Sequence, residues 1–256
     1  MEYQRFKNAE HVLILSFLHN QEENYLNVVA KHGFAVEAYQ TPCEMPNGMQ
    51  WTEEGLWVID QIFEDLYLLD ESGNILRKLP TVTENSSGVT VGGGYLWTAS
   101  NGTTELRPYR PTDTHESWVL KLDFRTGELV DRFPTPYGGR IHGIEWDDGM
   151  IWLTSFATPV SLILVESKDF SIVRKFPVQI ARPHGLAQGG DGIWCSHTTD
   201  KVILKYDKQT GEVTDRIDLR KEDPSPHGLS IRKGELWCCD IGESARGIFK
   251  IISNDE

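Results

Sequence analysis

The sequence predicts an all-β fold assembled from repeated small sheets, and two observations support this. A Gly followed nine positions later by a Trp occurs at five places: Gly48/Trp57, Gly88/Trp97, Gly143/Trp152, Gly185/Trp194 and Gly228/Trp237. Successive Trp residues of this pattern are 40, 55, 42 and 43 residues apart, a period typical of repeat architectures. The 256 residues also include 23 Gly, 12 Pro and 8 Trp, which indicates many turns and short strands.

Each repeat unit is expected to form four strands, and the unit around Trp194 shows them most clearly. Its strands are predicted to begin at His184 and to span 193–196, 201–206 and 213–219, with Gly-containing turns between them. A single sheet of this size cannot bury both of its faces, whereas sheets stacked around an axis can. The sequence therefore predicts a five-bladed β-propeller of four-stranded blades.

The two ends of the repeat region predict how the ring closes. The fifth unit has no fourth strand after its third, at 247–252, and residues 34–41 (FAVEAYQT) resemble the missing strand. An N-terminal strand that completes the last blade would remove the open sheet edges. Residues 1–33 are predicted to be a helical extension, with a helix over about 21–32, and residues 34–256 the propeller.

Composition argues against several classes of protein. The net charge is −13 and no run of Lys or Arg occurs, so a nucleic-acid partner is not expected. The apolar stretch at 12–18 is too short to cross a bilayer and lacks the features of a signal peptide, which predicts no membrane association and a cytoplasmic location.

The positions directly before each repeat Gly and three after each repeat Trp predict a functional site. Antiparallel geometry places the start of the first strand and the end of the second at one mouth of the channel. The first set is Asn47, Ser87, His142, His184 and His227, and the second is Asp60, Ser100, Ser155, His197 and Asp240.

Three histidines at equivalent positions of consecutive units predict a metal site. Neutral imidazole is a common ligand of divalent ions, so His142, His184 and His227 are candidate ligands for Zn, Mn, Fe or Mg. His197, Asp240 and Asp60 are candidate catalytic residues, as extra ligands, orienting groups or general bases. The alternative is that a polar residue at this position hydrogen-bonds the backbone of a neighbouring blade.

Basic residues near the same mouth predict recognition of an anionic substrate. Arg140 and Arg182 each lie two residues before a channel histidine, and the insertion at 101–117 adds Arg107 and Tyr109. This loop joins the second and third strands of its unit and is a candidate lid. With Asn47 and Ser87, these four residues form the predicted substrate-binding set, for which solvated arginines paired with acids are the alternative.

The pattern HGL…DGIW…D…TG resembles the streptogramin lyase (virginiamycin B lyase) group and, more loosely, the NHL and SMP-30 propellers. The resemblance covers roughly residues 34–252 and implies a propeller with a bound magnesium ion and lactone-opening lyase chemistry. The catalytic histidines of that family correspond here to His184 and His227, or to His142 and His184 one unit earlier. The position of the family's acidic partner holds Ser225 in the first case and Arg182 in the second. Plant-type glutaminyl cyclases are also five-bladed, although their motif is not matched here.

Together these observations predict a metal-dependent lyase or hydrolase that acts on a small ester, lactone or anionic metabolite at a histidine-lined mouth. The alternative is a non-enzymatic scaffold that binds a protein or small-molecule ligand. An enzyme predicts a deep polar pocket, and a scaffold predicts a flat, apolar surface.

Overall fold

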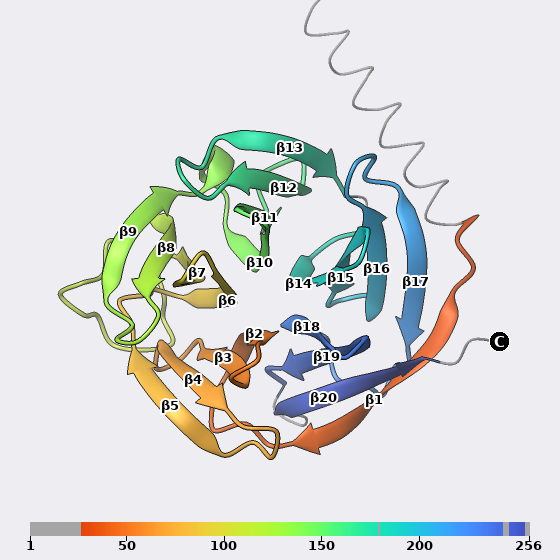
Figure 1. Cartoon of the computed structure of the whole chain (residues 1–256), viewed down its shortest axis with the longest axis horizontal. Helices are drawn as coiled ribbons and strands as arrows, with labels where there is room; N and C mark the ends of the chain where they lie inside the picture. The colour runs from red at the N-terminus through yellow and green to blue at the C-terminus, as the bar shows by residue number, and fades with distance from the viewer. Residues whose placement is uncertain (1–26, 179, 243–245, 254–256) are drawn as a thin grey trace, which may run out of the picture.

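The computed structural model describes residues 27–178, 180–242 and 246–253, and its regular secondary structure consists almost entirely of β-strands that surround a central axis (Figure 1). The strands follow the five repeat units, numbered here in chain order. Unit 1 holds β2 (Pro46–Trp51), β3 (Leu56–Asp60), β4 (Asp65–Leu69) and β5 (Ile75–Pro80). Unit 2 holds β6 (Ser86–Gly92), β7 (Tyr95–Asn101), β8 (Ser117–Asp123) and β9 (Leu129–Pro134). Unit 3 holds β10 (Ile141–Asp147), β11 (Met150–Ser155), β12 (Ser161–Glu166) and β13 (Ile172–Pro177), preceded by the short 3-10 helix η1 (Pro136–Gly138).

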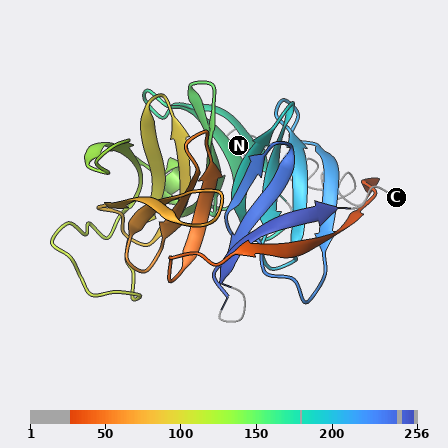
Figure 2. The ribbon, with the colours of Figure 1, turned by 60° about the horizontal axis from the view of Figure 1, so that its bottom comes forward.

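Units 4 and 5 share one sheet. Unit 4 holds β14 (Pro183–Gly189), β15 (Gly192–His197), β16 (Val202–Asp207) and β17 (Val213–Leu219). Unit 5 holds β18 (Leu229–Arg232), β19 (Glu235–Asp240), β20 (Gly247–Ser253) and the N-terminal strand β1 (Lys31–Tyr39). Units 1 to 3 are separate four-stranded antiparallel sheets, whereas the eight-stranded sheet runs β14-β15-β16-β17-β1-β20-β19-β18. Each unit extends outward from the central axis with its first strand innermost (Figure 1), and Figure 2 shows the same ring in a tilted view.

Strand β1 joins the two halves of the eight-stranded sheet. Most of it pairs antiparallel with β20, as the sequence predicts, and its first residues pair in parallel with β17, from Lys31↔Ile217 to Gly33↔Leu219. The predicted helix over 21–32 is wrong at its C-terminal end, because Lys31 and His32 already belong to this strand. Residues 1–26, on which the rest of that prediction falls, lie outside the described residues. At Lys31 and His32, backbone pairing with β17 and the continuation of β1 outweigh the local sequence signals for a helix.

The repeat glycines are required where the innermost strands meet. A Cβ on Gly48, Gly143 or Gly185 would overlap the backbone carbonyl of the residue before the next unit's repeat Gly. At Gly228 it would lie 2.7 Å from Cys239 Sγ and 2.9 Å from Met49 N of unit 1. Only glycine allows this approach, so the repeat Gly predicted from spacing marks the wall of the channel.

A belt of side chains links the units farther along the channel. In four units, the side chain two positions after the repeat Gly accepts a hydrogen bond from a backbone N–H of the next unit. That N–H belongs to the residue three positions after the next unit's repeat Gly. The side chains of Gln50, Thr90, Glu145 and Ser230 accept from Val91, Trp146, Gln188 and Trp51, respectively. The equivalent residue of unit 4, Ala187, has no side-chain acceptor. Gln50 Nε2 also donates to Glu145 Oε2 at 3.0 Å, between units 1 and 3.

The core lies between successive sheets. Trp57, Trp97 and Trp152 are at most 1% exposed and pack against apolar side chains of their own and the next unit.

Among the described residues, no helix has the length and apolar composition needed to cross a membrane.

Candidate functional site

Three histidines from consecutive units lie in a row at the end of the channel where the innermost strands begin. His142 lies in β10, His184 in β14, and His227 two residues before β18. His142 Nδ1 and His184 Nε2 are 2.8 Å apart, within hydrogen-bond distance. The rings of His184 and His227 meet edge to face, with centroids 4.8 Å apart. The structure thus brings together the three residues that the sequence proposed as metal ligands, in contact with one another in pairs.

His227 is held at the end of the row by oxygen atoms. Its Nδ1 lies 3.0 Å from the backbone carbonyl of Ser225 and 3.2 Å from Asp240 Oδ1. Because a carbonyl can only accept, Nδ1 is the donor in this contact, and Nε2 is the nitrogen outside it. Asp240 is therefore the one predicted catalytic carboxylate that contacts the histidine row.

Burial keeps two of the histidines neutral. Burial, together with the positive charges of Arg182 and Arg140 and with His227, lowers the pKa of His142 to about 4. Burial is also the main reason that the pKa of His184 lies well below its usual value, with His142, His227 and Arg182 adding to the shift and the His227 carbonyl opposing it. At neutral pH both rings are therefore uncharged, and in the hydrogen bond between them one ring donates its N–H while the other accepts through its lone pair.

Arg140 and Arg182 are exposed at the same mouth. Both lie close enough to the row for their charges to lower the pKa of His142, and Arg182 also lowers that of His184. Arg182 has a positive φ of 55°, which is uncommon for a residue other than glycine. Neither guanidinium has an acidic or hydrogen-bonding partner among the described residues, although the chain is strongly acidic. This arrangement concentrates positive charge next to the histidine row.

Asn47 and Ser87 occupy the positions equivalent to the histidines, but their side chains donate hydrogen bonds to neighbouring residues. The Ser87 hydroxyl donates to the carbonyl of Ile141 at 2.6 Å, and the Asn47 amide donates to the carbonyl of Ser86 at 3.4 Å and to Gln61 Oε1 at 2.7 Å. Both residues are at most 2% exposed. At these two positions the alternative suggested by the sequence, a polar side chain that links neighbouring structure, describes what is observed.

Asp60 and His197 are buried away from the row. Asp60 accepts the backbone N–H groups of Glu44, Met45 and Ile62, at 2.8, 3.3 and 2.9 Å, and so anchors the loops at the ends of β2 and β3. Asp240 anchors the equivalent loops of unit 5 through Ser225 and Gly242, both at 3.0 Å. His197 is fully buried, with Nε2 3.1 Å from the Tyr206 hydroxyl, and burial lowers its pKa to about 4. Both side chains are fully buried, and among the described residues no contact joins either of them to the histidine row.

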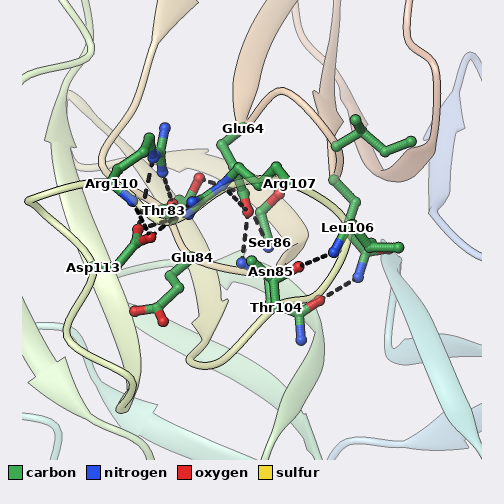
Figure 3. Close-up of polar contacts among 12 residues, drawn as sticks. Glu64, Thr83, Glu84, Asn85, Ser86, Thr104, Leu106, Arg107, Arg110 and Asp113 are labelled. Carbon is green, nitrogen blue, oxygen red and sulfur yellow. Dashed lines mark hydrogen bonds and ion pairs between the residues drawn. The ribbon is translucent and has the colours of Figure 1, made fainter.

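The insertion between β7 and β8 is anchored by a buried ion network rather than free to close over the mouth (Figure 3). Arg107 donates to both carboxylate oxygens of Asp113 at 2.7 Å, and its Nε lies 3.5 Å from Glu64. Arg110 donates to the carbonyl of Thr83, and Glu84 accepts the N–H groups of Thr114 and His115. The predicted binding residue Arg107 is therefore used internally.

Tyr109 lies at the exposed tip of the insertion. It is 65% exposed, and its ring stacks on His115 with centroids 5.6 Å apart. No contact joins Arg107 or Tyr109 to the histidine row among the described residues. The sequence could not reveal that Arg107 contacts Glu64, because the two residues are 43 positions apart and no spacing rule relates them.

Phe156 is a site residue that the sequence pattern missed. Its ring centroid lies 4.3 Å from that of His142, and it directly follows β11. An aromatic residue one position after the predicted mouth residue Ser155 was the only available signal. Phe156 gives the row an apolar wall on the side of unit 3.

The channel beneath the row is almost filled. The cavity lined by the repeat glycines, Asn47 and His142 has a volume of about 10 Å³, about the space that one water molecule needs. The deep polar pocket expected for an enzyme is not present in the channel, so a substrate would have to bind at the mouth.

The donor set at the mouth fits a divalent metal ion in its chemistry. His142 and His184 are neutral, and each of the three rings has a nitrogen outside the hydrogen bonds just described, including the buried Nδ1 of His184. Within the described part of the chain, no three His, Cys, Asp or Glu side chains are already grouped as a metal site. Binding would require the rings to turn from the His142–His184 hydrogen bond toward a common point.

Comparison with known proteins identifies the fold. No protein-family model and no curated protein sequence matches the chain. Among solved structures, the glutaminyl cyclase of Myxococcus xanthus is similar with a TM-score of 0.69 and 13% identity, covering 90% of this chain and 100% of that one. A streptogramin B lyase has a TM-score of 0.52 and 18% identity, over 87% and 98% of the two chains. A gluconolactonase from Xanthomonas campestris has a TM-score of 0.56 and 17% identity, over 81% and 73%.

The chain is therefore a β-propeller. It shares this fold with the streptogramin lyase, whose group the repeat motif resembles, and with the glutaminyl cyclase and the gluconolactonase. Identities of 13–18% are a statement about the fold and not about the reaction.

Proposed function

We propose that the chain is a five-bladed propeller enzyme, a metal-dependent lyase or hydrolase that acts at the histidine row. Each repeat unit is then one blade, and β1 links the last two. The innermost strands contact one another in the cyclic order β2, β6, β10, β14, β18 and back to β2, which supports a closed ring. The similar solved structures are described as a cyclase, a lyase and a lactonase, which favours an enzyme by analogy of fold.

The direct contact between His142, His184 and His227 is the observation that carries this proposal. These three residues would hold the ion, with Zn, Mn, Fe or Mg as candidates. A bound divalent ion polarises a carbonyl or phosphoryl oxygen and acidifies a bound water. Asp240 orients His227 through Nδ1, as carboxylates commonly do for ligating histidines.

The two exposed arginines favour the anionic member of the predicted substrates. Arg140 and Arg182 flank the row and lack acidic partners among the described residues, so an anionic group could pair with them without displacing an existing contact. Phe156 beside His142 would contact the apolar part of the same molecule. Because the channel is filled, only a group at the mouth could reach both the arginines and the imidazoles.

A non-enzymatic scaffold is the second candidate, and the small channel cavity favours it. In that case the His142–His184 hydrogen bond would be a structural link between units 3 and 4.

The cytoplasmic location expected from the sequence stays a prediction.

Elemental analysis of the untagged protein, purified without chelator, tests the metal proposal. We expect close to one divalent ion per chain, lost in the double variant His184→Gln, His227→Gln. The matched control is His115→Gln, because the His115 side chain is 55% exposed and lies in the insertion. Near-UV circular dichroism of each variant checks the fold.

A wild-type protein that stays metal-free after addition of Zn²⁺, Mn²⁺ and Mg²⁺ would end the metal proposal. Enzymatic action without metal would then be tested by screening small anionic esters and lactones against wild type and the variant Arg140→Gln, Arg182→Gln. Turnover that depends on both arginines would keep the enzyme proposal, and its absence across the panel would favour the scaffold.

A further inference from the structure

A chain of side-chain amides runs from the insertion to the channel. Asn85 Nδ2 donates to the carbonyl of Thr103, near the start of the insertion, at 3.4 Å. Gln61 Nε2 donates to Asn85 Oδ1 at 2.5 Å, and Asn47 Nδ2 donates to Gln61 Oε1 at 2.7 Å. The chain therefore joins units 2 and 1 and ends at Asn47, the residue directly before the repeat Gly of unit 1.

Backbone carbonyls fix the orientation of these amides. Asn47 Nδ2 also donates to the carbonyl of Ser86 at 3.4 Å, and because a carbonyl can only accept, the NH₂ group of Asn47 must be on this side. The Thr103 carbonyl fixes Asn85 in the same way at the other end. Turning any one amide over would bring two donors or two acceptors together. The free end of the chain is therefore an oxygen, Asn47 Oδ1.

Asn47 Oδ1 is a buried acceptor without a donor among the described residues. The side chain belongs to a residue that is 2% exposed, so bulk solvent does not replace the missing donor. A buried oxygen without a hydrogen bond is unfavourable, because the same oxygen is hydrated in the unfolded chain. The equivalent residue of unit 2, Ser87, has both kinds of partner, since it donates to the Ile141 carbonyl and accepts from Asn101 Nδ2 at 3.0 Å.

Asn47 also lines the channel cavity described above, whose volume of about 10 Å³ matches one water molecule. The lining consists otherwise of glycines and apolar residues, and His142 is the one further residue in it whose side chain carries nitrogen or oxygen. His184 Nδ1 is also buried and unpaired, but His184 does not line this cavity. A Ca²⁺ or Mg²⁺ ion would need about six oxygen ligands, whereas the lining side chains offer one.

We propose that the channel cavity binds one water molecule, which donates a hydrogen bond to Asn47 Oδ1 and contacts the His142 imidazole. These two partners meet the minimum that a buried water needs. Gln61 and Asn85 act as positioning residues, because each amide of the chain polarises the next and strengthens the final oxygen as an acceptor. The water thus links unit 1 to the histidine row, whether or not the row has the function proposed above.

An atomic-resolution crystal structure of the full-length protein tests the site. We expect a water peak about 3 Å from Asn47 Oδ1 in the wild type. Asn47→Leu removes the acceptor at similar side-chain volume and should lose the water. Gln61→Leu is the matched control, because it removes an amide one step along the chain and leaves Asn47 Oδ1 in place, so the water should remain.

Nuclear Overhauser effects from water to the methyl groups of Val89 and Leu229, which both line the cavity, test the site in solution. We expect these effects in wild type and in Gln61→Leu, and their loss in Asn47→Leu. Wild type and Gln61→Leu suffice for the test should Asn47→Leu fail to fold. The proposal is overturned if the wild-type cavity has no water peak, if the wild type shows no such effects, or if Asn47→Leu keeps the water.

Discussion

The Ser230 side chain accepts the backbone N–H of Trp51 at 2.8 Å, and this bond joins the last repeat unit to the first. Both residues are buried, Ser230 at 3% and Trp51 at 8% exposure. The same bond recurs between units 1 and 2, 2 and 3, and 3 and 4, with a different side chain each time. Ring closure therefore repeats a contact already used within the ring.

Ser230→Ala should lower the free energy of unfolding by about 1–2 kcal/mol, because the Trp51 N–H is left buried without its acceptor. Urea denaturation monitored by Trp fluorescence measures the change. Ser72→Ala, in an exposed turn, is the control and should change stability by less than about 0.5 kcal/mol. Equal effects of the two substitutions would contradict a role of this bond in closing the ring.

The opposite substitution is available at unit 4. Ala187 occupies the position of Ser230 but offers no acceptor, and the N–H of Ile231 is the equivalent donor. Ala187→Ser should therefore raise the free energy of unfolding by about 0.5–1 kcal/mol in the same denaturation assay. A loss of stability would mean that the hydroxyl cannot reach this donor from β14.

Gly143→Ala should be strongly destabilising, by about 3 kcal/mol, because its Cβ would overlap the carbonyl of His184. Relief of that overlap would also move His184 within the histidine row. Gly190→Ala is the comparison: its φ is 62° and no atom lies within 4 Å, so only the left-handed backbone contributes, about 1–2 kcal/mol. Thermal unfolding of both variants ranks the two costs, and a smaller loss for Gly143→Ala would contradict the close approach.

Arg107→Gln should destabilise the ligand-free protein by about 3 kcal/mol, because Glu64 and Asp113 would remain buried without their cation. Cleavage of the insertion in limited proteolysis should increase in parallel. Arg125→Gln, in an exposed turn, removes the same charge and should have little effect. If Arg107→Gln changed ligand binding but not stability, the role in substrate binding expected from the sequence would be restored.

Stability should fall as pH rises from 7 to 8 because of Glu145. Burial, with Asp147 contributing, raises its pKa to about 8, while hydrogen bonds from Gln188 and Gln50 and the charge of Lys208 oppose the shift. The folded protein thus binds more protons than the unfolded chain between about pH 4.5 and 8. Raising the pH from 7 to 8 therefore lowers the free energy of unfolding by about 1 kcal/mol.

The histidines act in the other direction and in another window. The lowered pKa of His142, His184 and His197 reduces stability as pH falls below about 6.5, so their contribution is constant between pH 7 and 8. Glu145→Gln should therefore flatten the dependence in that range, whatever its effect on mean stability. Denaturation at several pH values measures the slope, and an unchanged slope in the variant would exclude Glu145 as its source.

The sequence by itself determined the features that arise within one repeat. The Gly-to-Trp spacing predicted the units, and alternation with turn chemistry predicted β15, β16 and β17 to within one residue. The partner of β20 could also be foreseen, because an incomplete last unit leaves an open strand edge that residues 34–41 match in pattern. These signals are local, since side-chain direction along a strand and the residues of a turn depend on near neighbours.

Only the tertiary structure decided which of the equivalent polar residues share a site. His142, His184 and His227 meet, while Ser87 bonds to the backbone and Asp60 anchors loops, although all five occupy mouth positions in the repeat. Spacing cannot separate these outcomes, because each depends on which groups the packed neighbouring unit presents.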